Sequence, residues 1–402
     1  MFLLACMISI FDDRHCMSFS PVIETLRSLV AINSVNSSYE GGPGERAIAT
    51  WVREFFEQRG IVVWEQEVFP DRPNVIARLP GRDPSRRIIL EAHMDTVSVQ
   101  GMSIAPFDPR VEDGKIFGRG SCDTKAGLAA MMQAVASLHE EGIQPPCEVW
   151  LAAVVDEEFS YRGVVKLCEH LTGDAASAAH AALVAEPTGM RAIIAGKGVL
   201  RWRITVRGKA AHSSKPHLGV NAISHAARIV LAIEEDHARL AAKGHPLLGP
   251  ATVNVGIIRG GVQVNFVPDT CIIEIDRRML PGETGPGVLA HYQGLLDELK
   301  AQHPTFDAVM EPPMLVDEAL ETAADSAPAK VAGAVLSEMG LDATLGGVPF
   351  GSDASKLSRQ GIPSLIIGPG SIDQAHAAVE FVAISEVERA LTFYRNFITR
   401  FV

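Results

Sequence analysis

Polar side chains with metal-binding chemistry follow three strand-like apolar runs of the sequence. His93 and Asp95 come after the first run, Glu157 and Glu158 after the second, and Glu186 after the third. The carboxyl ends of parallel strands meet at one edge of a sheet, and open α/β sheets bind ligands there. We therefore expect these clusters to converge in space. Mixed imidazole and carboxylate donors suit zinc or a similar divalent ion.

Each of these residues also has an ordinary structural explanation when it is taken alone. His93 and Asp95 could be a surface histidine and a loop aspartate, or Asp95 could hold the imidazole of a metal-binding His93. Asp123 lies in a glycine-rich segment and could simply cap a helix. Glu157 and Glu158 could form a solvated acidic loop, although adjacent carboxylates repel each other unless a cation or a shared proton compensates.

Two further residues complete the donor set. Glu186 lies in an Ala-Glu-Pro-Thr segment, and His376 follows Gln374 and Ala375. If a metal is bound, one of the adjacent glutamates can coordinate it while the other acts as a general base. The residues are weak signals singly and a strong signal jointly.

Length and composition bound the architecture and argue against some functions. At 402 residues the chain exceeds the usual size of one hydrophobic core, so a large domain with a smaller one is expected. The formal net charge of -12 argues against nucleic acid or an anionic membrane as the main partner, because both require clustered Lys and Arg. The 6 cysteines lack CxxC spacing, which favours the reducing cytoplasm over a disulfide framework or a zinc knuckle.

The first residues form an apolar run that does not predict a targeting or membrane segment. Residues 1–11 lack a basic leading region, are too short to span a bilayer, and meet charged residues without a small-residue cleavage site. We interpret residues 1–18 as a disordered or over-extended N-terminal extension, with Met17 favoured as the first residue. The rest of the sequence contains no apolar stretch long enough for a transmembrane helix.

The pattern of strand-like and helix-like segments changes twice along the remaining sequence. Across residues 19–197, strand-like runs alternate with helix-period segments, which predicts an α/β fold with a mainly parallel sheet. Residues 198–313 follow a β-α-β-β-α-β order, which predicts an inserted α+β, ferredoxin-like domain. The chain then returns to the first domain over residues 314–402.

The first strand of the inserted unit alternates apolar and polar residues, as in a sheet with one wet face. Its apolar members are Leu200, Trp202, Ile204 and Val206. Its cationic members, Arg201, Arg203 and Arg207, are expected to form a solvated face rather than a binding patch.

The chain resembles the M20 metallopeptidase family, which includes acetylornithine deacetylases, succinyl-diaminopimelate desuccinylases, aminoacylases and carboxypeptidase G. The resemblance covers nearly everything from about residue 21 onward. Its motifs, in order, are Glu91-Ala92-His93-Met94-Asp95, residues 118–125, Asp156-Glu157-Glu158, Ala185-Glu186-Pro187-Thr188, residues 208–212, Asp276-Arg277-Arg278 with Pro281, Gly351-Ser352-Asp353, and residues 368–372 before His376.

The resemblance implies a centre of two divalent metal ions, expected to be Zn²⁺, with Co²⁺ or Mn²⁺ as alternatives. Asp123 would bridge the two ions. His93 and Glu186 would bind one ion, and Glu158 and His376 the other. It also implies a zinc-peptidase-like catalytic domain, in which the inserted unit serves as a lid and dimerisation domain, so that the protein forms a homodimer.

Further roles follow from the same resemblance. Glu157 would be the general base that takes a proton from the attacking water. His212 would reach the active site of the neighbouring subunit and help to stabilise the oxyanion. Arg278 would bind a substrate carboxylate, although an exposed strand cation is its alternative, and Asn265 would lie near the substrate. Asp95 would support catalysis by holding His93.

The expected reaction is hydrolysis of the amide bond of a small N-acyl amino acid, as in an acetylornithine deacetylase. Residues 368–376 resemble that branch most. However, Ala377-Ala378-Val379-Glu380 replaces its usual Pro-Asp pair before a Glu, and Ala126 precedes Gly127 where the family often has two glycines. Desuccinylase and carboxypeptidase or dipeptidase activities stay open. A catalytically silent, metal-stabilised binding protein would show a gap in the residue set, and the set has none.

Overall fold

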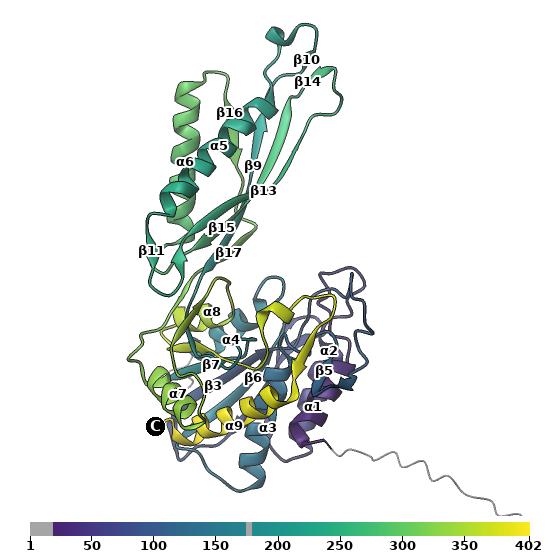
Figure 1. Cartoon of the computed structure of the whole chain (residues 1–402), viewed down its shortest axis with the longest axis vertical. Helices are drawn as coiled ribbons and strands as arrows, with labels where there is room; N and C mark the ends of the chain where they lie inside the picture. The colour runs from purple at the N-terminus through teal and green to yellow at the C-terminus, as the bar shows by residue number, and fades with distance from the viewer. Residues whose placement is uncertain (1–18, 174–178) are drawn as a thin grey trace, which may run out of the picture.

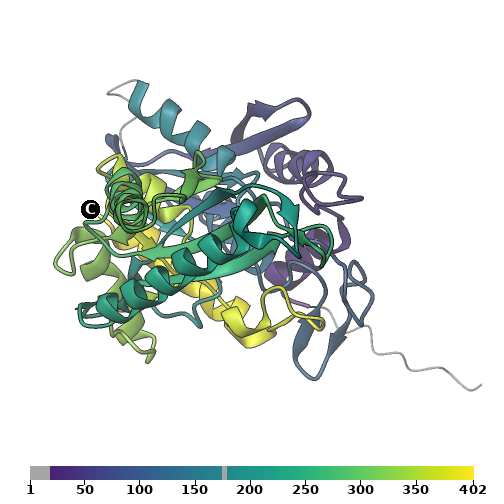
Figure 2. The same ribbon diagram turned by 90° about the horizontal axis from the view of Figure 1, so that it is seen from above.

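The computed structural model describes residues 19–173 and 179–402, and these form two parts, each built on a sheet of its own (Figure 1). The expected N-terminal extension, residues 1–18, lies outside the described residues. Figure 2 shows the molecule from above, where α5 of the second part lies over the first part. The predicted α/β class is confirmed.

The larger sheet has parallel strands at its centre. Its strand order is β1-β2-β6-β3-β7-β20-β8-β18, and β19 pairs with β8. Strands β6, β3, β7 and β20 pair in parallel, whereas β1–β2, β2–β6, β8–β18 and β8–β20 are antiparallel. Strands β1 and β2 are joined by a two-residue hairpin, which only an antiparallel pair permits. The bounds are β1 Val62–Phe69, β2 Arg72–Leu79, β3 Asp83–His93, β6 Cys147–Val154, β7 Ala181–Val184, β8 Ile193–Gly196, β18 Leu320–Glu321, β19 Gly346–Val348 and β20 Ser364–Ile366.

Helices cover both faces of this sheet. Leu90 of β3 packs in a core cluster with α1, α2, α3, α7 and α9, whereas Ile89 packs with α4 and α8. Strand β6 is buried along its whole length, as expected of a strand with helices on both sides. The bounds are α1 Pro21–Ala31, α2 Arg46–Glu57, α3 Lys125–Glu140, α4 Arg162–Gly173, α7 Ala327–Glu338, α8 Ala354–Arg359 and α9 Ile384–Arg400.

The second sheet is antiparallel, with helices on one face. Its order is β13-β15-β9-β16, and β17 also pairs with β9. Trp202 and its apolar neighbours on β9 pack against α5 and α6, as the alternation predicts. The chain follows the expected β-α-β-β-α-β order; the limits 198–313 of a separate domain stay a proposal. The bounds are β9 Gly198–Arg207, α5 Ala222–Leu240, β13 Thr252–Gly260, β15 Thr270–Met279, α6 Gly285–Gln302, β16 Asp307–Met310 and β17 Leu315–Asp317.

Two neighbouring passages connect the parts. The chain leaves the larger sheet at Gly198 and returns through Asp317, and a Cβ on Gly198 would lie 2.5 Å from the carbonyl oxygen of Asp317. Only glycine allows this approach of the two backbones.

Short elements complete the described chain. They are β4 Val111–Glu112, β5 Lys115–Phe117, β10 Ala211–His212, η2 Pro216–Leu218, β11 Gly244–His245, β12 Gly249–Pro250, β14 Phe266–Val267, η3 Ile372–Gln374 and β21 Phe381–Ala383. Within residues 19–173 and 179–402, no helix has the length and apolar character needed to cross a membrane. Cys122, Cys147 and Cys271 are buried and form no disulfide among the described residues, and Cys6 and Cys16 precede those residues.

Candidate metal centre

The predicted donor residues converge at one edge of the larger sheet. His93 ends β3, Glu157 and Glu158 follow β6, and Glu186 follows β7. Two groups of three have ligand atoms that all lie within 4.8 Å of one another: His93 with Asp123 and Glu158, and His93 with Glu157 and Glu186. The topology of the parallel strands therefore brings together residues that are far apart in the sequence.

Asp123 lies between the two histidines. Its Oδ1 is 3.1 Å from Nε2 of His93, and its Oδ2 is 3.4 Å from Nε2 of His376. Nε2 of His376 is also 3.1 Å from Oε2 of Glu158. Hydrogen bonds to Asp123 and Glu158 raise the pKa of His376 to about 10. A carboxylate with one oxygen toward each histidine has the position that a bridging ligand requires.

The carboxylates of the cluster repel one another. Burial raises the pKa of Glu157 and Glu186 well above its usual range, and the charge of Asp123 raises both further. Burial and Asp123 also raise the pKa of Glu158. Cations placed among these groups would offset both the cost of burying the carboxylates and their mutual repulsion. The donor set, with imidazole nitrogens and carboxylate oxygens, therefore fits divalent ions of the zinc type.

Asp95 acts differently from the sequence-based expectation. Nδ1 of His93 is 2.9 Å from the backbone carbonyl oxygen of Asp95, and the Asp95 carboxylate is farther away, at 3.7 Å. That carboxylate instead accepts hydrogen bonds from the backbone N–H groups of Glu157 and Glu158, each at 3.1 Å. The main chain thus orients the imidazole, and the Asp95 side chain positions the two glutamates.

A buried ion-pair network holds Asp156, the residue before Glu157. Asp156 has a φ of 68°, which strains any residue other than glycine. Nη2 of Arg72 donates to Asp156 Oδ1 at 3.0 Å and to Glu45 Oε1 at 2.7 Å. Nδ2 of Asn36 donates to Asp156 Oδ1 at 3.0 Å and to Asp95 Oδ2 at 2.8 Å. Sequence reasoning missed Asn36, Glu45 and Arg72, whose types and spacing carry no signal of their own.

Glu380 supports the segment that carries Asp123. Its Oε1 accepts hydrogen bonds from the backbone N–H groups of Cys122 at 2.9 Å and Asp123 at 3.1 Å. Its Oε2 accepts a hydrogen bond of 2.6 Å from Nη1 of Arg119. A carboxylate from the C-terminal region thereby fixes the backbone of Asp123. The sequence marked Glu380 only as the residue that ends a family pattern.

A pocket of about 320 Å³ opens onto this cluster, within the size range of small-molecule sites. Asp123, Glu157, Glu158, Glu186 and His376 line it together with residues of both parts of the chain. Arg278 of the second sheet is in this lining, which fits its expected contact with substrate. Arg201 is in it as well, although the sequence predicted only a solvated position.

The structure does not bring His212 and Asn265 to this pocket. Strand β10, which contains His212, pairs with β14 at the far end of the second part from the larger sheet (Figure 1). His212 is exposed, with Nδ1 2.8 Å from Oγ of Ser214. Asn265 lies beside it and accepts a backbone hydrogen bond of 3.0 Å from Ser213. Within one chain, these two residues are therefore separate from the metal cluster.

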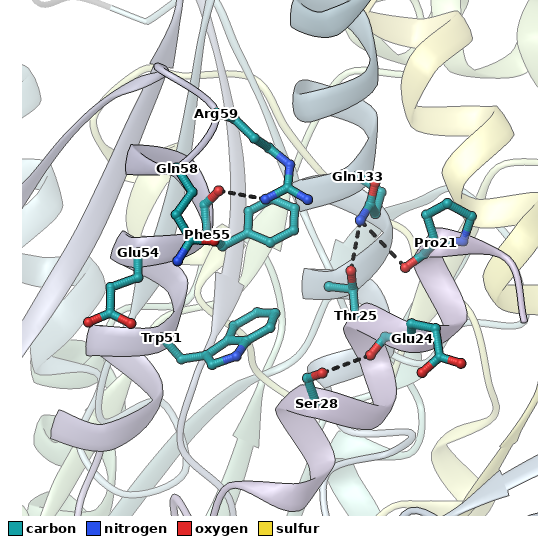
Figure 3. A pocket seen from close by; sticks show the side chains of 10 residues that line it. All are labelled: Pro21, Glu24, Thr25, Ser28, Trp51, Glu54, Phe55, Gln58, Arg59 and Gln133. Atoms are coloured by element: carbon teal, nitrogen blue, oxygen red, sulfur yellow. Dashed lines mark hydrogen bonds between the residues drawn. The ribbon is translucent and has the colours of Figure 1, made fainter.

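A second hollow, of about 340 Å³, lies between α1, α2 and α3 (Figure 3). Its polar groups are hydrogen-bonded to one another: Gln133 Nε2 donates to Thr25 Oγ1 at 2.7 Å, and Arg59 Nη1 donates to the carbonyl of Phe55 at 2.8 Å. Its two carboxylates, Glu24 and Glu54, are exposed. This hollow therefore lacks a cluster of side chains suited to catalysis, whereas the pocket at the metal cluster contains one.

Replacing Arg72 with methionine should lower the free energy of unfolding by about 3–5 kcal/mol, because Glu45 and Asp156 lose a buried cation. The matched control is Arg46→Met, which removes an ion pair to Glu65 in which the Arg46 side chain is 41% exposed. That change should cost under about 1 kcal/mol. Urea denaturation of both variants measures the difference, and equal costs would contradict the role given to Arg72.

Comparison with known proteins places this site in a family. Residues 89–400 match the profile of peptidase family M20/M25/M40. An acetylornithine deacetylase of Myxococcus xanthus is 30% identical over 325 residues, covering 79% of this chain and 81% of that protein. A probable carboxypeptidase of Aspergillus terreus is 29% identical over 410 residues, covering 95% of this chain and 87% of that protein.

Solved structures show the same fold. Aminopeptidase PepT from Bacillus cereus has a TM-score of 0.78 at 24% identity, covering 94% of this chain and 97% of that one. A Bacillus subtilis protein described as a dinuclear metal binding peptidase of family M20 has a TM-score of 0.72 at 17% identity, covering 95% and 98%. The chain therefore belongs to peptidase family M20/M25/M40, and it is a hydrolase that acts on amide bonds.

Proposed function

We propose that this chain is a two-metal hydrolase that removes the acyl group from a small N-acyl amino acid. The observation that carries the proposal is the position of Asp123 between His93 and His376, with Glu157 beside the cluster. The similarity to the Myxococcus acetylornithine deacetylase supports the reaction class. We also propose a cytoplasmic location, on the spacing of the cysteines.

In this proposal, Asp123 would be shared by two ions, His93 and Glu186 would hold one, and Glu158 and His376 would hold the other. Divalent ions of the zinc type, with Co²⁺ or Mn²⁺ as alternatives, would lower the pKa of a water molecule and polarise the substrate carbonyl. Asp95 and Glu380 keep the backbone around the ligands in place through the hydrogen bonds described above.

Glu157 is the proposed general base. Its carboxylate lines the pocket beside the proposed ligands, where it can accept a proton from the attacking water. Glu157 takes a proton from the attacking water as the water oxygen bonds to the carbonyl carbon. It then delivers that proton to the amide nitrogen as the C–N bond breaks, so that a free amine and a carboxylic acid leave.

Arg278 is the proposed partner of the substrate carboxylate. Its Nε donates to Oδ1 of Asp276 at 2.8 Å, which orients the guanidinium on the sheet surface that faces the pocket. A guanidinium in a fixed orientation suits the planar geometry of a carboxylate.

We further propose that His212 and Asn265 act on the active site of a second subunit. Strand β13 is an edge strand of the second sheet, and its Ile258 is 51% exposed. Val262 and Val264, in the loop that follows, are 90% and 100% exposed. An apolar sheet edge is suited to pairing with another chain, and such pairing would form a homodimer.

Carboxypeptidase or dipeptidase activity is the second candidate. The Aspergillus relatives named probable carboxypeptidases align with nearly the full chain. Hydrolysis rates on N-acetylornithine, N-succinyl-diaminopimelate, other N-acyl amino acids and dipeptides separate the candidates. Inactivity on every acyl amino acid, with activity on dipeptides, would replace the first proposal by the second.

Glu157→Ala should retain bound metal but lose about 10²–10⁴-fold in kcat, because the proton transfer loses its base. Metal content and steady-state hydrolysis of N-acyl amino acids measure the two effects separately. Glu67→Ala, at an exposed position of β1, is the control and should keep wild-type turnover. Wild-type kcat in Glu157→Ala would refute the assignment.

Removing divalent ions with a chelator should abolish turnover and lower the melting temperature. Ions that bind only the folded state stabilise it by mass action, and here they would also offset the repulsion among buried carboxylates. Adding back Zn²⁺, Co²⁺ or Mn²⁺ should restore both properties in the wild type and much less in Asp123→Asn. Chelator-resistant activity in a metal-free sample would contradict the two-metal proposal.

Mixing Glu157→Ala with His212→Ala should restore activity if His212 serves the partner's site. Each variant alone would be nearly inactive, whereas a mixed dimer contains one complete site. Random exchange of subunits makes about half of the dimers mixed, and each mixed dimer has one complete site out of two. The mixture should therefore reach about a quarter of wild-type turnover. A mixture as inactive as its components, despite subunit exchange shown by native mass spectrometry, would rule out the contribution across subunits.

A further inference from the structure

Two guanidinium groups share one carboxylate on the pocket-facing side of the second sheet. Arg201 on β9 is the cross-strand partner of Asp276 on β15, and Arg278 follows Asp276 by two residues on the same face. Nε of Arg201 donates to Asp276 Oδ2 at 2.8 Å, and Nε of Arg278 donates to Asp276 Oδ1 at 2.8 Å. The three side chains carry one net positive charge.

The next arginine on this face of β9, Arg203, has more carboxylates around it than Arg201 has. Arg203 donates to Glu274 at 2.9 Å and lies 3.5 Å from Glu311, so two carboxylates surround one guanidinium. The carboxylates thus outnumber the guanidinium group around Arg203, whereas the guanidinium groups outnumber the carboxylate beside the pocket.

Arg201 is available to a ligand in that pocket. Its hydrogen bond to Asp276 uses Nε, and its Nη nitrogens have no partner among the described residues. Its side chain is 47% exposed. It also lies near Tyr39 of the first part, whose hydroxyl donates a hydrogen bond of 3.0 Å to the carbonyl of Glu158. Burial and Glu158 raise the pKa of Tyr39, and the charge of Arg201 acts against them.

The rest of the lining offers no free carboxylate. The acidic residues in it, Asp123, Glu157, Glu158 and Glu186, all belong to the proposed metal ligands and base. Most of the remaining lining is aromatic or aliphatic, and includes Phe159, Tyr161, Leu315, Phe350 and Ile372. A substrate side chain with an ammonium group would therefore meet guanidinium groups and apolar walls without a counter-ion.

We propose that Arg201 is a specificity-determining residue that excludes cationic side chains, so that the pocket takes N-acyl amino acids with apolar or acidic side chains and discriminates against ornithine. This inference rests on the proposed amide hydrolase function. Within that function, Arg278 holds the substrate carboxylate and Arg201 sets the charge that the substrate side chain can carry. Like charges brought together in a partly desolvated pocket repel more strongly than in water.

The test compares N-acetylnorleucine with N-acetylornithine, because norleucine carries a methyl group where ornithine carries its ammonium group. The wild-type protein should favour N-acetylnorleucine at least about tenfold in kcat/KM, mainly through KM. Arg201→Gln should reduce that preference about tenfold, and Arg201→Lys, which keeps the charge, should preserve it. N-acetylglutamate should be hydrolysed faster than N-acetylornithine by the wild type, and Arg201→Gln should slow its hydrolysis.

Arg207→Gln is the matched control. Arg207 lies on the same outward side of β9, is exposed, and is outside the pocket lining, so its loss should leave the preference unchanged. Calorimetric titration of the two acyl amino acids into metal-loaded Glu157→Gln measures the same discrimination as dissociation constants, without turnover.

The outcomes separate this inference from the function on which it rests. Faster hydrolysis of N-acetylornithine, or a preference unaltered by Arg201→Gln in a folded variant, overturns the role of Arg201 and leaves the deacylase proposal standing. Failure to hydrolyse any acyl amino acid overturns the deacylase proposal itself. Thermal melting of each variant verifies that it is folded.

Discussion

Asp123, Glu157, Glu158 and Glu186 bring their charges together in a buried place, where water screens them poorly. This repulsion would push the strand ends apart if nothing opposed it. His93 and His376 supply nearby nitrogens, and the donor set suits divalent cations. The surrounding backbone must therefore be rigid enough to keep the carboxylates close in spite of their mutual repulsion.

That rigidity comes from charged groups outside the cluster. Asp95 ties down the backbone of Glu157 and Glu158, Glu380 does the same for Asp123, and Arg72 neutralises Asp156. Asp95 and Glu380 are buried, Arg72 is mostly buried, and all three are hydrogen-bonded, so a truncated side chain would leave its partner without compensation. The supports come from both ends of the chain, so the site depends on the whole first part being folded.

Sequence patterns predicted the fold class and the convergence of the ligand residues for a clear physical reason. Strand periodicity shows where each strand ends, and parallel pairing places those ends together. The alternation along β9 likewise predicted the buried side of the second sheet around Trp202. Such patterns are local, and they do not show which distant side chain a residue will meet. The roles of Arg72 and Glu380, the carboxylate contacts of Asp95, and the pocket position of Arg201 therefore emerged only from the structure.

The pocket has its proposed metal ligands in the part built on the larger sheet and its guanidinium groups on the second sheet, and two neighbouring passages of the described chain, at Gly198 and Asp317, join these parts. A molecule that contacts both walls must span the gap between them. The orientation of the two sheets thus sets the length of substrate that can engage both ends at once. Selection by length then depends on the joint at Gly198 and Asp317, which directly adjoins Val199 and Leu315 of the pocket lining.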